Sequence, residues 1–167
     1  MKIGLLSDTH SYLDESIFHH FDKVDEIWHG GDIGDPAVLR QLTAFKPTQA
    51  VFGNIDNKDL QAALPEELLL ERGGSKVLMT HIAARAPRYN KRVKELIIAH
   101  KPQILVCGHS HILKVAYDKV NQLLYVNPGA CGRHGFHKMR TIIRFEINSG
   151  RPEKMEVIEL GTRAKSA

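Results

Sequence analysis

Seven side chains with oxygen or nitrogen donor atoms follow short apolar segments of this 167-residue sequence. Each stands where an apolar run of strand length ends, and the seven residues are Asp8, His10, Asp32, Asn54, His81, His109 and His111. Carboxylate, amide and imidazole groups together suit Mn, Fe or Zn better than Ca or Mg. Seven donors are too many for one tetrahedral ion, and they fit two divalent ions that share a carboxylate. The residue types therefore indicate a two-metal site.

Each of these motifs also has an ordinary structural explanation when it is taken alone. An Asp-x-His pair can be a helix cap beside a surface histidine, and Gly-Asp and Gly-Asn are common turns. A single histidine after a strand commonly forms a structural hydrogen bond. Metal binding is favoured over these explanations only because donors follow five different apolar segments of the same chain.

The donors can converge only if the apolar segments form sheets whose strand ends meet. Apolar runs of strand length alternate with helical patterns, which predicts an α/β organisation. In α/β sheets, ligands bind outside the carboxyl ends of the strands. The predicted strands are 2–7, 26–30, 49–53, 76–81, 103–108, 114–120, 122–127, 140–147 and 154–160, and the predicted helices are 14–24, 36–46, 58–64 and 88–101.

The ordered motifs SDTH, GGD, GN, TH and GHSH, with NPGA at 127–130, resemble the signature of the calcineurin-like metallophosphoesterase superfamily. The resemblance runs from Met1 to about Ile147, and the short chain is similar to the small single-domain phosphodiesterase branch. It implies a four-layer αββα sandwich, in which two mixed β-sheets are flanked by helices. We expect a single domain over residues 1–167, with a frayed tail at about 162–167.

The resemblance also implies how the donors divide between two ions. The first ion would be held by Asp8, His10, Asp32 and His111, and the second by Asp32, Asn54, His81 and His109. Asp32 would bridge the ions, for which Mn²⁺ is expected, with Fe, Zn or Ni as alternatives. The implied activity is hydrolysis of a small phosphodiester or nucleotide-type ester by a metal-bridging hydroxide. The catalytic residues would be Asp32, Asn54 and His81.

One position departs from the family pattern. Many members have Gly-Asn-His, whose histidine protonates the leaving oxygen, whereas this chain has Ile55 after Gly53 and Asn54. The small phosphodiesterase branch commonly lacks that histidine too. We therefore expect activity with a preference for leaving groups that depart without protonation, such as aryl esters. The neighbouring Asp56 is expected to form a structural hydrogen bond.

Two loops carry polar residues that could contact a substrate. They are Arg85, Arg88 and Tyr89 in loop 82–92, and Arg133, His134 and His137 in loop 132–138. Simple exposure to solvent is the preferred alternative for these residues. His29 lies within a predicted buried strand, so we expect it to pack in the core or to orient a metal ligand.

Composition and charge limit the class of protein. The chain is 43% hydrophobic and 25% charged, which is typical of a globular protein and excludes collagenous and wholly disordered classes. We find no signal peptide or membrane-spanning pattern, and two cysteines are too few for a disulfide framework. The sequence thus predicts a cytoplasmic protein that has no membrane partner.

Two other functions are compatible with the sequence. The retromer scaffold subunit is similar in fold but has a degraded site and works as a protein-interaction platform. A nuclease is the other alternative, because segment 84–101 contains six Lys or Arg residues and one Glu. The complete donor set favours an enzyme, and a chain this short leaves no room for an added nucleic-acid domain. We expect a small phosphoester as the partner and no nucleic acid. An apolar surface strand could also support a homodimer.

Overall fold

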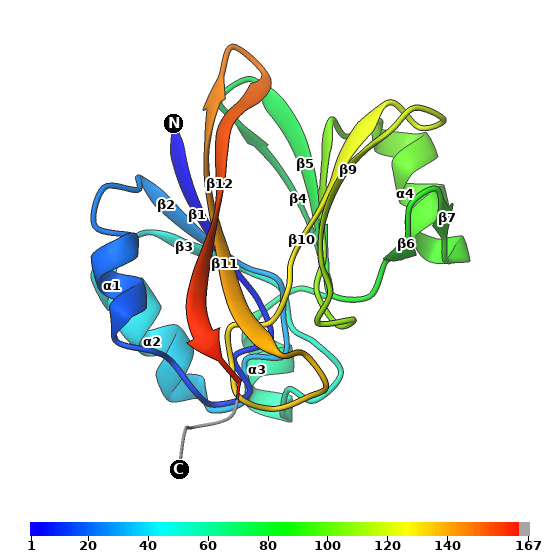
Figure 1. The fold of residues 1–167 in the computed structure, drawn as a ribbon. Helices are drawn as coiled ribbons and strands as arrows, with labels where there is room; N and C mark the ends of the chain where they lie inside the picture. Colours follow the sequence, from blue (N-terminus) through cyan, green and yellow to red (C-terminus); the bar gives the residue numbers. More distant parts are fainter. Residues whose placement is uncertain (164–167) are drawn as a thin grey trace.

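Two five-stranded sheets form the centre of the molecule in the computed structural model, which describes residues 1–163 (Figure 1). The first sheet has the order β12-β11-β1-β2-β3. Its parallel strands are β1 (Lys2–Leu6), β2 (Glu26–His29) and β3 (Thr48–Ala50), and its antiparallel strands are β11 (Met139–Asn148) and β12 (Arg151–Thr162). This sheet is therefore mixed, as expected.

The second sheet has the order β4-β5-β8-β10-β9. Its parallel centre consists of β5 (Ser75–Thr80), β8 (Ile104–Val106) and β10 (Leu123–Pro128), and its antiparallel edges are β4 (Glu67–Arg72) and β9 (Leu113–Asp118). A small hairpin of β6 (Ala84–Arg85) and β7 (Arg88–Tyr89) leaves this sheet after β5. The helices are α1 (Ser16–His20), α2 (Pro36–Phe45), α3 (Lys58–Ala63) and α4 (Lys91–His100).

Three clusters of buried apolar side chains separate four layers. The central cluster lies between the two sheets and includes Trp28 and Val106. A second cluster packs α1 and α2 against the first sheet, and a third packs α4 against the second sheet through Val93 and Ile97. The helices accordingly lie outside the two sheets (Figure 1). The predicted four-layer αββα sandwich is confirmed.

The helix starts have local causes in the sequence. The Asp35 carboxylate accepts the Ala37 N–H at 2.7 Å, and Pro36 occupies the first turn of α2, where its missing N–H costs nothing. The Asn90 side chain accepts the Val93 N–H at 2.9 Å and begins α4. Helix α4 is therefore shorter than the predicted 88–101, because its first residues form β7.

Strand β4 was not predicted, although a signal for it exists. Gly73 and Gly74 have φ angles of 55° and 82° and join β4 to β5 as a two-residue hairpin turn. Two glycines between apolar runs are typical of such hairpins, since both turn positions need positive φ.

The first two residues of the expected tail, Thr162 and Arg163, belong to the fold. Thr162 ends β12, and the Arg163 N–H donates to the Lys138 carbonyl at 2.9 Å, so both residues are tied to the fold. Residues 164–167 lie outside the described part of the chain. Within residues 1–163, no helix is long and apolar enough to cross a membrane.

Candidate metal centre

The loops that carry the predicted donors leave the carboxyl ends of parallel strands in both sheets. Three of them follow β1, β2 and β3, and two follow β5 and β8. Backbone hydrogen bonds join these loops to one another: the Asp8 N–H donates to the Gly31 carbonyl at 3.0 Å, and the Gly108 N–H donates to the His81 carbonyl at 3.1 Å. Residues separated by a hundred positions in the chain thus meet at one place.

The first group of donors consists of Asp8, His10 and His111, whose ligand atoms all lie within 4.8 Å of one another. Nε2 of His111 is 3.1 Å from Oδ1 of Asp8. The Asp8 side chain is fully buried and also accepts the His109 N–H at 3.2 Å. Its position is consequently fixed from two neighbouring segments.

The second group consists of Asp32, His81 and His109, again with ligand atoms within 4.8 Å of one another. Nδ1 of His81 donates to the Gly30 carbonyl at 2.8 Å, so Nε2 is the atom that faces Oδ1 of Asp32 at 3.2 Å. The carboxamide oxygen of Asn54 is 2.9 Å from Nδ1 of His109. Asn54 therefore adjoins this group, which places all seven predicted donors at one site.

Asp32 stands between the two groups. Its Oδ1 faces His81 in the second group, while its Oδ2 lies 3.6 Å from Nε2 of His10 in the first group. One carboxylate is therefore directed at both sets of imidazoles.

The buried donor atoms have the chemistry that divalent ions accept. Nε2 of His10 and Nε2 of His81 are buried and have no hydrogen-bond partner. In a neutral imidazole that donates through Nδ1, Nε2 is an acceptor with a lone pair, and in His81 this lone pair points at a carboxylate oxygen. Two acceptors facing each other in a buried site fit a cation between them, so the residues present fit divalent metal ions.

The electrostatics of the site keep Asp32 charged and His10 neutral. Burial lowers the pKa of His10, and the nearby charges of Asp32 and Asp8 offset this only in part. Burial alone would raise the pKa of Asp32, but the nearby His81 imidazole and the Ile55 N–H lower it below its ordinary value. For His81, burial lowers the pKa, but the nearby carboxylates of Asp32 and Asp8 have the larger effect and raise it above its ordinary value.

Backbone strain is concentrated at the donors. Five of the seven have positive φ angles between 44° and 67°: Asp8, His10, Asp32, His109 and His111. Side chains other than glycine rarely adopt this region, which costs about 1 kcal/mol or more per residue. Such strain persists where surrounding contacts hold it, and it is typical of functional sites.

The motif glycines let the backbone approach these donors closely. A Cβ at Gly53 would overlap Oδ1 and the backbone nitrogen of Asp32. Gly31 has a φ of 97°, and a Cβ there would lie 2.7 Å from Nδ1 of His81. Both positions therefore require glycine because of their neighbours in space.

Asp56 has the structural role expected for it. Its carboxylate accepts the Gly34 N–H at 2.8 Å and the Gly53 N–H at 2.7 Å. It thereby connects the loop after β2, which carries Asp32, to the loop after β3. The neighbouring Ile55 is 45% exposed, and its N–H donates to Oδ1 of Asp32 at 3.1 Å.

His29 supports the loops from inside the core. It is fully buried, its Nδ1 accepts the Gly31 N–H at 3.1 Å, and its Nε2 donates to the Thr9 hydroxyl at 3.0 Å. The Thr9 hydroxyl in turn donates to the Ile33 carbonyl at 2.9 Å. Burial lowers the pKa of His29 to about 4, so this imidazole is neutral at pH 7. Both expectations for His29, core packing and support of the donors, describe this position.

His137 has a contact that sequence reasoning missed. Its Nε2 donates to the Gly132 carbonyl at 3.0 Å, which leaves its Nδ1 to accept from Nδ1 of His111 at 3.3 Å. His111 therefore presents Nε2 to Asp8. The sequence placed His137 only in a loop at the pocket rim, because no local pattern links it to His111.

The predicted substrate contacts have different surroundings. Arg85 lines a cavity beside His109, and the His134 ring lies 4.9 Å from the His10 ring. Arg88 is exposed and pairs with Arg85 across the β6–β7 hairpin. The Arg133 guanidinium lies 4.1 Å from the centre of the Tyr12 ring. These placements leave Arg85 and His134 adjacent to the donors.

Tyr89 is not retained as a substrate contact. Its side chain is only 4% exposed and packs in the cluster under α4. Its hydroxyl donates to the Asp118 carboxylate at 2.9 Å. The alternation of β7 turns Tyr89 into the core, which gives it a structural role.

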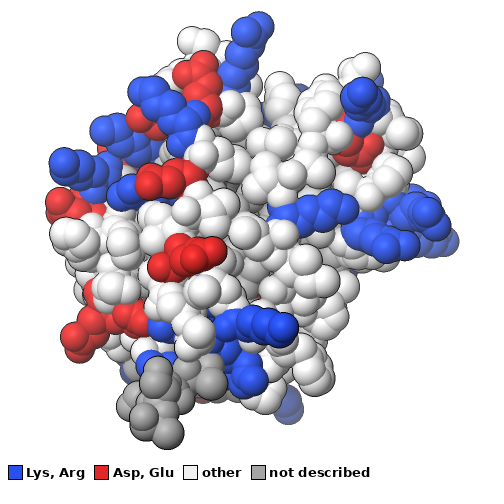
Figure 2. Space-filling view, in the orientation of Figure 1, with Lys and Arg blue, Asp and Glu red and all other residues white. Residues whose placement is uncertain are grey.

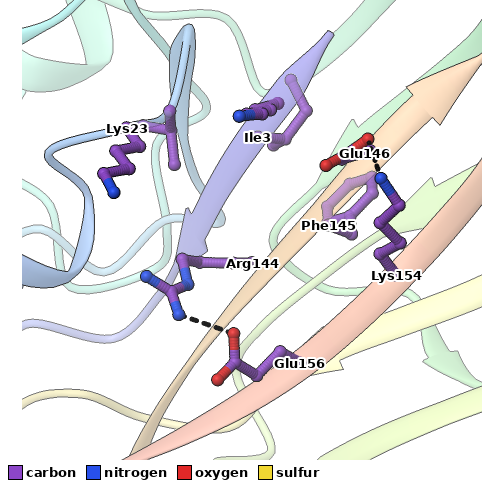
Figure 3. A pocket seen from close by; sticks show the side chains of 9 residues that line it. Ile3, Lys23, Arg144, Phe145, Glu146, Lys154 and Glu156 are labelled. Carbon is purple, nitrogen blue, oxygen red and sulfur yellow. Dashed lines mark hydrogen bonds and ion pairs between the residues drawn. The ribbon is translucent and has the colours of Figure 1, made fainter.

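A separate cavity of about 280 Å³ lies on the outer face of the first sheet, near the C-terminal end of α1 (Figure 3). Its two acidic residues are already paired, Glu156 with Arg144 at 2.6 Å and Glu146 with Lys154 at 3.1 Å. It shares no lining residue with the seven donors. The donors therefore define the candidate metal centre, and this cavity is distinct from it.

Known proteins are similar to this chain over most of its length. The model of the calcineurin-like phosphoesterase superfamily domain matches residues 1–150. A probable metallophosphoesterase from Methanocaldococcus jannaschii is 32% identical over 137 residues, which cover 78% of this chain and 68% of that protein.

Solved structures show the same fold at lower identity. An archaeal phosphodiesterase has a TM-score of 0.76 and 21% identity, with 96% of this chain and 100% of that chain covered. Vps29 from Entamoeba histolytica complexed with Zn²⁺ has a TM-score of 0.71 and 17% identity, with 95% and 99% covered. From the domain match and the identity to the archaeal relative, we conclude that this chain belongs to the calcineurin-like phosphoesterase superfamily.

Proposed function

We propose that the chain is a dinuclear-metal phosphodiesterase that hydrolyses a small phosphodiester or nucleotide-type ester. Membership of a metallophosphoesterase family supports a metal-dependent hydrolase in general. The observation that carries the finer proposal is the position of Asp32, whose two carboxylate oxygens face His10 and His81, one from each donor group. A shared carboxylate is what a pair of ions requires.

The residues divide between two ion sites in this proposal. Asp8, His10 and His111 would hold one ion, and Asn54, His81 and His109 the other, with Asp32 shared. Mn²⁺ is the first choice of metal, and Fe, Zn or Ni are alternatives with the same donor preferences. When bound, a pair of divalent ions lowers the pKa of water and polarises a phosphoryl oxygen.

The side chains of this site orient and position the reactants. His81 is held by the Gly30 carbonyl, so its ring cannot turn away from Asp32 without losing a buried hydrogen bond. Asn54 is exposed at the site and can bind a substrate oxygen through its amide group. The Ile55 side chain offers no proton to a leaving oxygen. We therefore expect aryl esters to be hydrolysed faster than alkyl esters.

An interaction scaffold on the same fold is the second candidate. Its support is the similarity to Vps29. Fold alone does not separate a scaffold from an enzyme, because function resides in the site. The presence of all seven donors, five of them in strained conformations, favours the enzyme.

The test is hydrolysis of bis-p-nitrophenyl phosphate by protein stripped with a chelator and reloaded with Mn²⁺. Asp32→Asn keeps the shape of the side chain but removes the charge shared by the two groups, so we expect kcat to fall by about 10³-fold or more. The matched control is Asp22→Asn at an exposed carboxylate on the α1 side, which should leave kcat unchanged. Equal activity of wild type and Asp32→Asn, or none in reloaded wild type, would refute the enzyme.

A further inference from the structure

A cavity of about 560 Å³ opens directly beside His109. Three segments line it, and they are Ile82–Arg85, the loop residues Gly108, His109, Ser110 and Ile112, and the strand residues Lys114 and Tyr125. The volume lies in the range of small-molecule sites, about 300 to 1,000 Å³. Because His109 belongs to both the cavity wall and the second donor group, a ligand in the cavity would extend to the candidate metal centre.

The cavity walls are apolar and held in place. Ile82 and Ile112 both line the cavity, and their exposed fractions are 37% and 65%. The Tyr125 hydroxyl donates to the Ala84 carbonyl at 3.1 Å and so ties the β6 strand to the second sheet. The cavity therefore does not depend on a ligand to bring its walls together.

The polar groups of the cavity are cationic or neutral. Arg85 and Lys114 line it, and none of its lining residues is a carboxylate. Nζ of Lys114 already lies 5.9 Å from the centre of the Tyr125 ring. Figure 2 shows Lys and Arg side chains gathered on the side of the molecule where β6, β7 and α4 lie. An anionic ligand is consequently favoured at this side of the site.

From this arrangement we propose that the cavity binds an aromatic group of the substrate, so that the substrate class is aryl or nucleobase-bearing phosphoesters. The inference rests on the proposed function, because the phosphate of such a ligand would lie at the donor site. A planar ring buries apolar area against Ile82 and Ile112. It also offers a face to the cations of Arg85 and Lys114, which an alkyl group cannot do.

The experiment compares the binding of three phosphonates that carry the same anion. Isothermal titration calorimetry on Mn²⁺-loaded protein would give the affinities of phenylphosphonate, n-butylphosphonate and methylphosphonate. We expect phenylphosphonate to bind about tenfold more tightly than methylphosphonate, and n-butylphosphonate to fall between them. In Ile112→Asn the phenyl-to-methyl ratio should drop to about two, with methylphosphonate affinity unchanged. The control Ile98→Asn alters an isoleucine of α4 that is 73% exposed and outside the cavity, and should keep the wild-type ratio.

Each outcome bears on the cavity. Equal affinity for the phenyl and methyl ligands in wild type would overturn the cavity assignment. A phenyl-to-methyl affinity ratio that stays at the wild-type value in both Ile112→Asn and Ile82→Asn would overturn it as well. In either case, hydrolysis of bis-p-nitrophenyl phosphate would leave the proposed function intact. Butyl binding as tight as phenyl binding would overturn the aromatic assignment. If no phosphonate bound and no hydrolysis occurred, both proposals would fail together. The wild-type ratio needs no variant, so the test stands even if a substitution prevents folding.

Discussion

The two donor groups differ in what lies next to their imidazoles. In the first group, His111 is backed by His137, and the His134 ring lies beside His10. In the second group, His109 is exposed and forms part of a cavity wall. One group is therefore surrounded by the protein's own side chains, and the other opens toward a space that a ligand can enter.

This difference indicates that the two donor groups, which share the Asp32 carboxylate, have different roles. A histidine whose outer nitrogen is held by another side chain has a fixed tautomer and orientation, which strengthens metal binding. Nδ1 of His109 is also held, by Asn54, but both of these side chains are exposed, so they can adjust together when a substrate arrives. We expect the first group to bind its ion more tightly and the second group to determine how substrates are positioned.

Among the variants that compare the two groups, the largest effect should come from removing one imidazole from each group. His10→Ala and His81→Ala should each lower the metal content of reloaded, desalted protein by about one ion per chain, because Asp32 continues to serve the other group. Each should also lower kcat for bis-p-nitrophenyl phosphate by about 10²-fold to 10³-fold. Elemental analysis and steady-state kinetics measure the two quantities.

The control for these variants is His100→Ala, at an exposed histidine in the last turn of α4. It should bind as much metal as wild type. If His10→Ala and His81→Ala both lost the full metal content, the two groups would be one cooperative site and the comparison would not hold.

An intermediate effect is expected from His137, whose Nδ1 lies 3.3 Å from Nδ1 of His111. In His137→Ala, Nδ1 of His111 loses its acceptor, and the affinity of the first group for Mn²⁺ should fall about 10-fold to 100-fold. His137→Gln supplies a side-chain oxygen that can accept the same hydrogen bond, so it should restore part of the affinity. Metal titration followed by Mn²⁺ electron paramagnetic resonance measures this directly.

A merely structural role for His137 predicts a different pattern. Both variants would then lower the free energy of unfolding to a similar extent, and the affinity for Mn²⁺ would stay the same. The second ion provides an internal reference, because its binding should be unaffected in either variant.

Most of the fold and the donors could be predicted from the sequence, for a physical reason. Parallel strands that are buried on both faces read as continuous apolar runs, and β1, β2, β5 and β8 all have this pattern. Donors directly after such runs must lie at the carboxyl edge of a sheet. The sequence pattern alone therefore predicts that Asp8, Asp32 and His109 converge.

The remaining features depend on contacts between distant segments. No local pattern relates His137 to His111, since the contact arises from how loop 132–138 packs after β10. Tyr89 belongs both to loop 82–92 and to the predicted helix 88–101, and only the short β6–β7 hairpin and the Asp118 carboxylate explain its burial. The cavity at Ile82 and Ile112 likewise combines two loops that follow different strands. The periodicity of apolar residues indicates which face of a single helix or strand is buried. It does not indicate which two elements come into contact, and these features depend on such contacts.

The smallest effect on hydrolysis at pH 7 is expected from His29, which lies behind both groups through Thr9 and Gly31. Burial lowers its folded pKa to about 4 from an ordinary value of 6.5. Between these values the unfolded chain binds a proton that the folded chain does not, so stability falls as the pH drops through this window. The loss attributable to His29 between pH 7 and pH 4.5 should be about 2 to 3 kcal/mol.

Urea unfolding of chelator-treated protein at several pH values measures this dependence. His29→Gln can still accept from the Gly31 N–H and donate to the Thr9 hydroxyl, but it does not titrate, so its stability should decline less steeply below pH 6.5 than that of wild type. Its kcat at pH 7 should stay within about tenfold of wild type, because His29 is already neutral there. Identical pH slopes for the two proteins would mean that His29 is protonated in the fold. The hydrogen bonds of a neutral His29 to Thr9 and Gly31 would then no longer explain how the core supports the loops of both donor groups.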